Sequence, residues 1–323
     1  MSLPAESRPL GVVAVAVPLA AQTAAWQRIA CMLSDVSQLV RPRIAVMVLA
    51  TVVAGAWVTA GRPADGVAFA GLLCGTALIA ASSSVVNQVL ERHTDRLMPR
   101  TAGRPVAAGR LGVGMAAMLA TAGLVAGGVV IVVSGGWEPA GAAVLTWLVY
   151  VVAYTPLKRI SPLNTAVGAV AGALPVAIGW LAAAGPQRVA AGDTRGTLAA
   201  AALATVLYLW QFPHFMAIAW LYRRQYAAAG LRMLTVVDPS GLRAAGQALA
   251  AALAMIPASL VLAVPSGSIR LFLAAAVAAV AYAMATFRFA IRRDDAAARG
   301  LLLTSLGSLL GLLAAAVVFG GTR

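Results

Sequence analysis

The chain has 323 residues, of which 61% are hydrophobic and 11% charged, and its formal net charge is +14. Soluble domains contain roughly 45–50% apolar and about 25% charged residues, so this composition provides too little polar surface to coat a water-soluble globule. It excludes a soluble enzyme, a wholly disordered chain and, with only two cysteines, a disulfide-rich secreted scaffold.

A short apolar stretch over residues 11–25 comes first along the chain. A signal peptide would need a basic segment and a cleavage site, and neither is evident. The stretch is also shorter than the roughly 20 residues that cross the hydrocarbon core of a bilayer. We therefore expect residues 1–35 to form an N-terminal leader, interfacial or disordered, ahead of a single domain over residues 36–323.

Nine apolar runs of about 18–25 residues follow, and each is long enough to cross a bilayer. They predict an all-α polytopic membrane protein with nine transmembrane helices. The predicted spans cover residues 44–61, 66–90, 112–134, 138–156, 163–184, 196–221, 243–265, 270–289 and 301–320.

The basic residues gather on alternate connections between these spans. If the N-terminus lies in the cytoplasm, all but five of the 24 Lys and Arg residues fall on the cytoplasmic side. Cytoplasmic loops of membrane proteins carry such an excess, so the pattern predicts an N-in/C-out topology. The net charge thus has its explanation in the lipid bilayer, and we expect no nucleic acid partner.

The first candidate site lies where the second predicted span leaves the membrane. Asn87, Glu91 and Asp95 are spaced four residues apart, so on a helix their side chains share one face. Carboxylate and amide oxygens are hard ligands that suit Mg²⁺. The spacing therefore predicts a magnesium site.

Three arginines, Arg96, Arg100 and Arg104, follow this acidic face. A guanidinium holds phosphate oxygens through paired hydrogen bonds, so acids and arginines together predict a site for a metal–diphosphate. The same residues also fit a solvated helix end with ion pairs and with the charges that fix membrane topology. The spacing alone leaves both interpretations open.

The second candidate site is the end of the fourth predicted span. Pro156 stops the helix there, and Tyr154, Lys158 and Arg159 surround it. Lys158 is the only lysine of the chain. The alternative is an interfacial tyrosine anchor followed by topology charges.

The third candidate site lies inside the sixth predicted span. His214 follows Pro213 and lies roughly 13 Å before Arg223, and an ionisable side chain at such depth indicates function. Trp210 and Gln211 add an aromatic surface and a second polar group. The alternatives are a packed core histidine and an aromatic stripe that only packs.

Two connections on the predicted cytoplasmic side are longer and more polar than the others. They cover residues 91–111 and 222–242, and they follow the second and sixth spans. Because a metal–diphosphate needs polar groups on two sides, we expect the two connections to face each other across one cytoplasmic cavity.

The motifs together resemble the protohaem IX farnesyltransferases, or haem O synthases, of the UbiA superfamily of intramembrane prenyltransferases. The resemblance covers roughly residues 35–320. It rests on LVRPRI, on N-x-x-x-E-x-x-x-D with MPRTAGRP after it, on YTPLKR with SPLNTAVGAVAGALP, and on WQFPHF. It implies nine transmembrane helices around a central cavity.

The resemblance also implies an activity. The farnesyl group of farnesyl diphosphate would be transferred to a vinyl group of haem B (protohaem IX), with Mg²⁺ as cofactor, to give haem O and diphosphate. The implied location is the cell (inner) membrane, with the active site on the cytoplasmic side. Implied protein contacts are haem A synthase and terminal oxidase assembly factors.

The same resemblance gives each candidate residue a role. The implied metal ligands are Asn87, Glu91 and Asp95, which are also catalytic together with Arg104, Tyr154 and Lys158. The implied diphosphate-binding residues are Arg96, Arg100, Arg104, Lys158, Arg159, Arg223 and Tyr226. The implied haem-binding residues are Trp210, Gln211 and His214.

The chain departs from the family pattern after the sixth span. Family members carry an acid directly before the tyrosine there, where this chain has Arg224 and Gln225, and they commonly carry an acid at the position of His93. A missing carboxylate lowers metal affinity. Two alternatives therefore stay open: a UbiA-type prenyltransferase for another acceptor, and a non-catalytic haem-binding or transport protein of the membrane.

Overall fold

The computed structural model describes residues 19–61, 63 and 65–321, with side chains from residue 30 onward. Within these residues every regular element is a helix. Nine helical stretches of this part of the chain are long and apolar enough to cross a membrane. The predicted all-α architecture with nine spans is therefore confirmed.

Seven spans are unbroken helices, and two are divided into shorter ones. The unbroken spans are α2 (Pro42–Ala60), α3 (Gly66–Arg96), α4 (Val113–Gly135), α10 (Arg195–Leu221), α13 (Leu242–Ala263), α14 (Ile269–Arg292) and α15 (Asp295–Phe319). The divided spans consist of α5 (Trp137–Leu148), η1 (Val149–Tyr154) and α6 (Thr155–Leu157), and of α7 (Asn164–Ala173) and α8 (Pro175–Ala182). Outside the spans lie α1 (Leu19–Val40), α9 (Gly185–Ala190), α11 (Arg223–Ala228) and α12 (Leu234–Val237).

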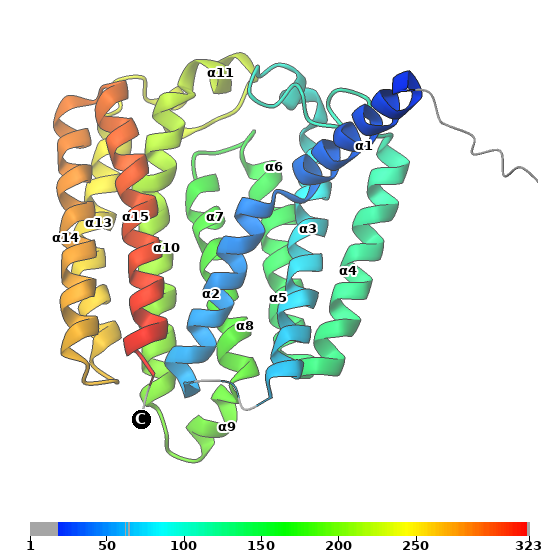
Figure 1. Ribbon diagram of the computed structural model, residues 1–323. Helices are drawn as coiled ribbons and strands as arrows, with labels where there is room; N and C mark the ends of the chain where they lie inside the picture. Colours follow the sequence, from blue (N-terminus) through cyan, green and yellow to red (C-terminus); the bar gives the residue numbers. More distant parts are fainter. Residues whose placement is uncertain (1–18, 62, 64, 322–323) are drawn as a thin grey trace, which may run out of the picture.

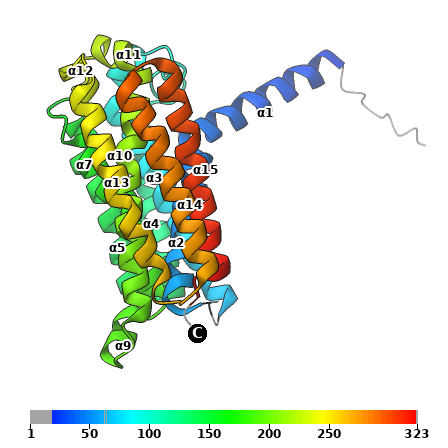
Figure 2. The ribbon, with the colours of Figure 1, turned by 90° about the vertical axis from the view of Figure 1, so that its left-hand side faces the viewer.

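The spans stand side by side in one bundle (Figure 1). The connection between α3 and α4 lies at the same end as α11, which is drawn uppermost and is called the upper end here. The short helix α9 lies at the opposite end, as does the C-terminal end of α15. At the upper end α1 leaves the bundle and points away from it (Figure 2).

The last turns of α1 are tied to the bundle by a side chain of α3. The amide nitrogen of Gln88 donates to the main-chain oxygens of Gln38 and Leu39, at 2.9 and 3.2 Å. The boundary predicted after residue 35 thus falls inside a continuous helix. Residues 1–18 of the predicted leader lie outside the described residues, and the single domain over residues 36–323 stays a prediction.

Helix α3 runs beyond residue 90, where the apolar run predicts that the span ends, and continues to Arg96. The apolar run stops where charged side chains begin, but helical backbone bonds continue regardless of side-chain charge. Asn87, Glu91 and Asp95 therefore stand on one helix, and all three are buried. The longer helix keeps the predicted acidic face inside the bundle.

Helices α3 and α4 approach each other closely at a pair of glycines. A Cβ atom on Gly75 would lie 2.7 Å from the main-chain oxygen of Gly127, and one on Gly127 would lie 2.7 Å from that of Gly75. A side chain at either position would push the helices apart. The glycines therefore permit the backbone-to-backbone packing that small residues favour between membrane helices.

Two irregular helical segments supply residues to the interior of the bundle. The π-helical turn η1 precedes Pro156, whose missing N–H interrupts regular α-helical bonding. Pro213 stands inside α10 and has the same effect there. Both irregularities adjoin side chains that line the cavity described next.

Candidate active site

A cavity of about 480 Å³ lies inside the bundle. Its lining residues on α3 extend from Thr76 to Asp95, which corresponds to roughly 28 Å of helix at 1.5 Å per residue. The part near the upper end is charged, whereas Ile79, Trp147 and Ile178 make the deeper part apolar. The charged lining residues are Arg41, Glu91, Asp95, Arg100, Arg104 and Lys158.

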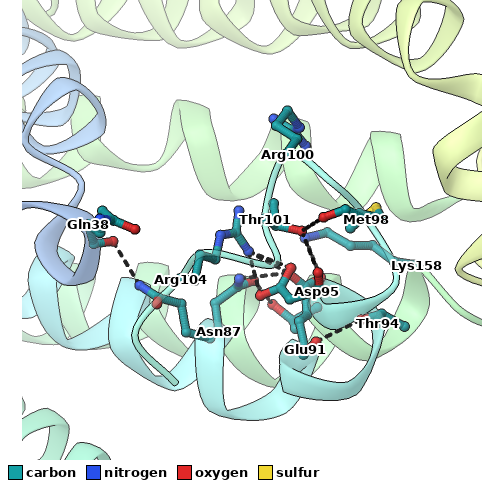
Figure 3. Close-up of polar contacts among 12 residues, drawn as sticks. Gln38, Asn87, Glu91, Thr94, Asp95, Met98, Arg100, Thr101, Arg104 and Lys158 are labelled. Atoms are coloured by element: carbon teal, nitrogen blue, oxygen red, sulfur yellow. Dashed lines mark hydrogen bonds and ion pairs between the residues drawn. The ribbon is translucent and has the colours of Figure 1, made fainter. Parts of the chain in front are cut away.

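The three oxygen-bearing side chains predicted to share one face of a helix do so. Asn87 donates its amide N–H to Glu91 Oε2 at 2.7 Å and accepts a hydrogen bond from the Thr155 hydroxyl at 3.1 Å. Asp95 lies one turn further along α3 (Figure 3). Since α3 remains helical to Arg96, the whole row is held by a rigid element.

Two cations from other parts of the chain bind this row. Lys158 Nζ lies 2.9 Å from Glu91 Oε1, and Arg104 Nη1 donates to both carboxylate oxygens of Asp95 at 2.7 Å each (Figure 3). Lys158 also lies 4.3 Å from the centre of the Tyr154 ring. The solvated helix end considered for these residues is wrong, because the acids are buried and paired across the fold.

Burial and neighbouring charges shift the ionisation of the side chains around the row. Burial alone would lower the pKa of Lys158, but Tyr154 and Glu91 outweigh it and raise that pKa above its usual range. Burial and the charge of Arg41 lower the pKa of Arg104, although Asp95 opposes them. Burial raises the pKa of Tyr226. Lys158 is therefore a cation and Tyr226 a neutral phenol at physiological pH.

The two long connections both line the cavity, as predicted, and they contact each other there; that this end is cytoplasmic stays a prediction. Arg100 lies 4.5 Å from the centre of the Tyr222 ring, and its guanidinium is 3.4 Å from the Tyr226 hydroxyl. Both arginine and phenol therefore belong to one wall. The first connection supplies the lining residues Asp95, Met98, Arg100 and Arg104, and the second supplies Tyr226, Leu231 and Met233.

Three predicted diphosphate ligands do not line the cavity. Arg96 is exposed and donates to the main-chain oxygen of Ala107 at 2.6 Å. Arg159 is also exposed, and Arg223 forms an ion pair with Asp295 at 2.9 Å. The three side chains lie at the surface or contact other partners, so the structure does not place them where a diphosphate in the cavity would lie.

The predicted haem-binding residues divide into two groups. Gln211 and His214 line the cavity. Trp210 does not: its indole N–H donates to the main-chain oxygen of Ser305 at 2.8 Å, and its ring stacks on His214 with centres 4.5 Å apart. Trp210 therefore supports the His214 ring by stacking on it and does not line the cavity itself. His214 is packed and hydrogen-bonded, as the core-histidine alternative expects, and it also lines the cavity.

The hydrogen bonds of Ser305 assign the protonation of His214. The Ser305 hydroxyl uses its one hydrogen to donate to the Leu302 main-chain oxygen at 2.6 Å, so it accepts from His214 Nδ1 at 2.7 Å. Nδ1 therefore carries the ring proton. Nε2 keeps its lone pair and has no hydrogen-bond partner among the described residues, which leaves it available to a ligand in the cavity.

The position of the missing acid lies outside the cavity lining. Gln225 follows the exposed Arg224, and its side-chain oxygen is buried without a hydrogen-bond partner. Across the described residues no group of three or more His, Cys, Asp or Glu side chains is placed to hold a metal ion. A metal here would depend on Glu91, Asp95, the Asn87 amide oxygen and oxygens of a ligand.

Several cavity residues escaped the sequence analysis. Arg41 counted only as a topology charge, although it directly precedes a proline at the start of a span. Tyr150 carried no motif signal. Tyr222 and Thr155 do not line the cavity themselves but contact Arg100 and Asn87 beside it. The one available signal for Tyr150 was its four-residue spacing from Tyr154, which places both rings on one helix face.

The UbiA prenyltransferase family matches residues 48–319 of the chain. A "Protoheme IX farnesyltransferase" of Rhodopirellula baltica is 41% identical over 85% of this chain and 96% of its own length. One of Solibacter usitatus is 38% identical over 84% of this chain and 94% of its own length. A UbiA homologue of Archaeoglobus fulgidus, solved bound to DMAPP and Mg²⁺, superposes with a TM-score of 0.62 at 16% identity, covering 88% of this chain and 99% of that one.

Proposed function

The chain belongs to the UbiA prenyltransferase family, and from that premise we propose that it transfers the farnesyl group of farnesyl diphosphate to a vinyl group of haem B. The products are haem O and diphosphate. One observation carries the proposal: a single cavity joins a cationic upper part to a deep apolar part that presents an unprotonated histidine nitrogen. Relatives that share most of the chain bear the name of this activity.

The upper part of the cavity suits the diphosphate. Four cations line it against two carboxylates, so its net charge is positive before any ligand binds. Lys158 presents its N–H groups to the cavity from the turn after α6, and Arg100 and Arg104 present theirs from the connection between α3 and α4. As the bond between the diphosphate and the farnesyl carbon breaks, these groups stabilise the negative charge that develops on the leaving oxygens.

The acidic row fits Mg²⁺ that arrives with diphosphate. Glu91, Asp95 and the amide oxygen of Asn87 are hard donors of the type that Mg²⁺ prefers. Each carboxylate already binds a cation of the protein, and the surrounding positive charge disfavours a bare divalent ion. When bound, Mg²⁺ would neutralise part of the charge on the leaving diphosphate. The UbiA homologue from Archaeoglobus fulgidus, bound to DMAPP and Mg²⁺, supports this cofactor.

The deeper part of the cavity suits the farnesyl chain and the allylic cation. Apolar side chains bury the chain and exclude water from the forming cation. Tyr150 and Tyr154 both line the cavity, with ring centres 5.3 Å apart. One face of the Tyr154 ring faces Lys158, so the Tyr150 ring is the surface free to stabilise the cation by cation–π contact.

The haem lies against α10 in this proposal. The unprotonated Nε2 of His214 is an axial ligand for the haem iron, since neutral imidazole is a common haem ligand. Gln211 offers a polar group one turn away. Trp210 acts through His214 by stacking on it and does not touch the haem. A vinyl carbon of the macrocycle attacks the farnesyl carbon, water completes the hydroxyethylfarnesyl group, and a proton and diphosphate leave.

The same proposal locates the protein. The nine spans make it a multi-pass membrane protein. We place it in the cell (inner) membrane with the upper end in the cytoplasm, on the support of the basic connections at that end. Haem O is a substrate for further modification, so contact with haem A synthase or terminal oxidase assembly factors belongs to the proposal.

A reconstituted reaction tests the activity. Purified full-length protein in lipid nanodiscs is incubated with haem B, farnesyl diphosphate and Mg²⁺, and the haems are analysed by mass spectrometry. We expect haem O to form and diphosphate to be released in equal amounts, and both to require Mg²⁺. Farnesylation of a quinone or chlorin precursor without haem O would contradict the acceptor, and binding of haem without any transfer would contradict the enzyme.

A further inference from the structure

Arg41 lies at the joint between α1 and α2 and reaches the cavity from there. Its backbone has φ 49° and ψ 67°, the left-handed conformation that residues other than glycine rarely adopt. Pro42 follows as the first residue of α2 and disfavours the right-handed helical conformation for the residue before it. The two helices therefore meet at a fixed angle, and the guanidinium is among the cavity-lining groups.

The guanidinium of Arg41 has no partner among the described residues. Each of the other three cations of the cavity has a polar partner: Lys158 binds Glu91, Arg104 binds Asp95, and Arg100 reaches the Tyr226 hydroxyl. The Nη2 atom of Arg41 is buried and makes no hydrogen bond. Buried polar groups of proteins are nearly always satisfied, so an unsatisfied charged donor facing a cavity indicates a ligand.

The charge balance indicates that the ligand is an anion. Arg41 and Arg104 lie close enough for their positive charges to repel each other. Four lining cations face two carboxylates, so the cavity has an excess of two positive charges. A Mg²⁺–diphosphate carries about one negative charge, so it would leave positive charge uncompensated. One further anionic oxygen group would complete the balance.

We propose that Arg41 forms a second anion subsite of the cavity, which binds the oxygens of a carboxylate or phosphate group through its paired N–H donors. The identity of the ligands rests on the proposed function. There, the residual charge favours a haem propionate, and the other source of the same chemistry is a phosphate of farnesyl diphosphate. Arg41 is then a specificity-determining residue, because it recognises a group remote from the bond that is made.

The test compares Arg41→Gln with Arg43→Gln. Arg43 stands two residues further along α2, is exposed and does not line the cavity, so its substitution removes the same charge outside the site. Each full-length protein in nanodiscs is titrated separately with haem B, with haem B dimethyl ester and with inorganic diphosphate. The ester has no free propionate and thus isolates the carboxylate contribution.

We expect Arg41→Gln to weaken the affinity for haem B by about tenfold or more, since it removes a charge-assisted contact. The affinity for the dimethyl ester should not change, which also demonstrates that the variant is folded. The parent should itself bind the ester more weakly than haem B by a similar factor. Arg43→Gln should match the parent for all three probes.

The remaining outcomes distinguish a carboxylate from a phosphate as the ligand of Arg41, and the anion subsite from the proposed function. A loss confined to inorganic diphosphate would support the subsite and assign it to phosphate. Unchanged affinities of Arg41→Gln for all three probes would overturn the subsite. Arg41→Gly, which adopts the positive φ without strain, should give the same losses as Arg41→Gln. A parent that binds neither haem B nor diphosphate would overturn the proposed function instead.

Discussion

Asp95 is the acid whose role depends most on its charge, because it is fully buried and both of its oxygens accept from Arg104. We expect Asp95→Asn to lower kcat/KM for farnesyl diphosphate by about 100-fold or more. The amide keeps the shape and one oxygen, but it removes the negative charge that faces the metal and Arg104 and replaces the second acceptor oxygen with a donor. Rates of haem O formation at varied farnesyl diphosphate measure the loss.

A matched control for that variant exists on the surface. Asp35 pairs with Arg110 at 2.7 Å, also through an aspartate and an arginine, but outside the cavity. Asp35→Asn should change kcat/KM by less than about twofold, because an exposed ion pair contributes little. Equal effects of the two substitutions, or full activity in Asp95→Asn, would contradict the acidic site.

Lys158 should remain a cation across the working pH range. Its pKa is raised above the usual 10.5, so its charge and the stability that it contributes are fully present below that pH and are lost only as pH rises through the raised value. We expect no loss of diphosphate binding from this group up to about pH 10. Calorimetric titrations of inorganic diphosphate at several pH values test this. An alkaline loss below pH 9 that disappears in Lys158→Gln would refute it.

Ser305 fixes the ring proton of His214 and should therefore affect haem without affecting diphosphate. Ser305→Ala removes the acceptor for Nδ1–H, and we expect about a 3- to 10-fold weaker affinity for haem B. Ser305→Thr should restore it, because the hydroxyl returns. Ser308→Ala on the same helix is the control, since the hydrogen bond of the His214 ring goes to Ser305 and not to Ser308. Equal haem spectra and affinities in Ser305→Ala and the parent would sink the assignment of the tautomer.

At the scale of helices, α7 provides the space that Tyr154 occupies. A Cβ on Gly168 would lie 2.7 and 2.9 Å from atoms of the Tyr154 ring, so the ring would have to move. We expect Gly168→Ala to reduce haem O formation about tenfold and to lower the free energy of unfolding by about 1–3 kcal/mol. Activity assays and thermal unfolding measure the two effects.

Gly246→Ala is the matched control for Gly168→Ala. It is also a glycine within a spanning helix, but a Cβ there meets nothing within 4 Å. Removing a helical glycine should then raise stability by about 0.5–1 kcal/mol, and activity should not change. Equal activity and stability of the two alanine variants would show that the position of the Tyr154 ring does not matter for the reaction.

Most of the helical architecture could be predicted because a spanning helix needs about 20 apolar residues, a signal that single side chains barely alter. The ends of the helices were harder. Hydropathy changes at residue 90, yet α3 continues to Arg96 because its backbone bonds persist and partners elsewhere in the fold satisfy the charges. The π-helical turn at Val149–Tyr154 had no sequence signal beyond Pro156.

The candidate site could be predicted where spacing on one helix decided the geometry. Asn87, Glu91 and Asp95 share a face because α-helical periodicity requires it. Residue type alone was a poor guide to the cations. Arg223 was expected at the diphosphate and instead pairs with Asp295, whereas Arg41 was taken for a topology charge and lines the cavity. The two arginines differ in where their side chains point in the folded protein, and the sequence does not give that direction.

For the molecule as a whole, the two ends of the cavity divide the chemistry. Charged groups from α3, the connection after it and Lys158 meet near the upper end, while apolar groups of α3, α5 and α8 form the depth. A substrate that joins a diphosphate to a farnesyl chain therefore fits in one orientation, with the diphosphate near the upper end and the chain in the apolar depth. In the proposed reaction, this orientation would hold the reacting carbon at the level where Tyr150 and Tyr154 line the cavity.

The ion pairs inside the cavity mean that the protein supplies its own counter-ions. Before any substrate arrives, Glu91 and Asp95 neutralise Lys158 and Arg104, so these two cations need no salt ions from water. When diphosphate binds, its oxygens replace the carboxylates of Glu91 and Asp95 as partners of these cations. We expect the dissociation constant of inorganic diphosphate to change by less than about threefold between low and moderate ionic strength, since buried pairs are weakly screened. A steep dependence on potassium chloride in calorimetric titrations would instead indicate capture at an exposed basic surface.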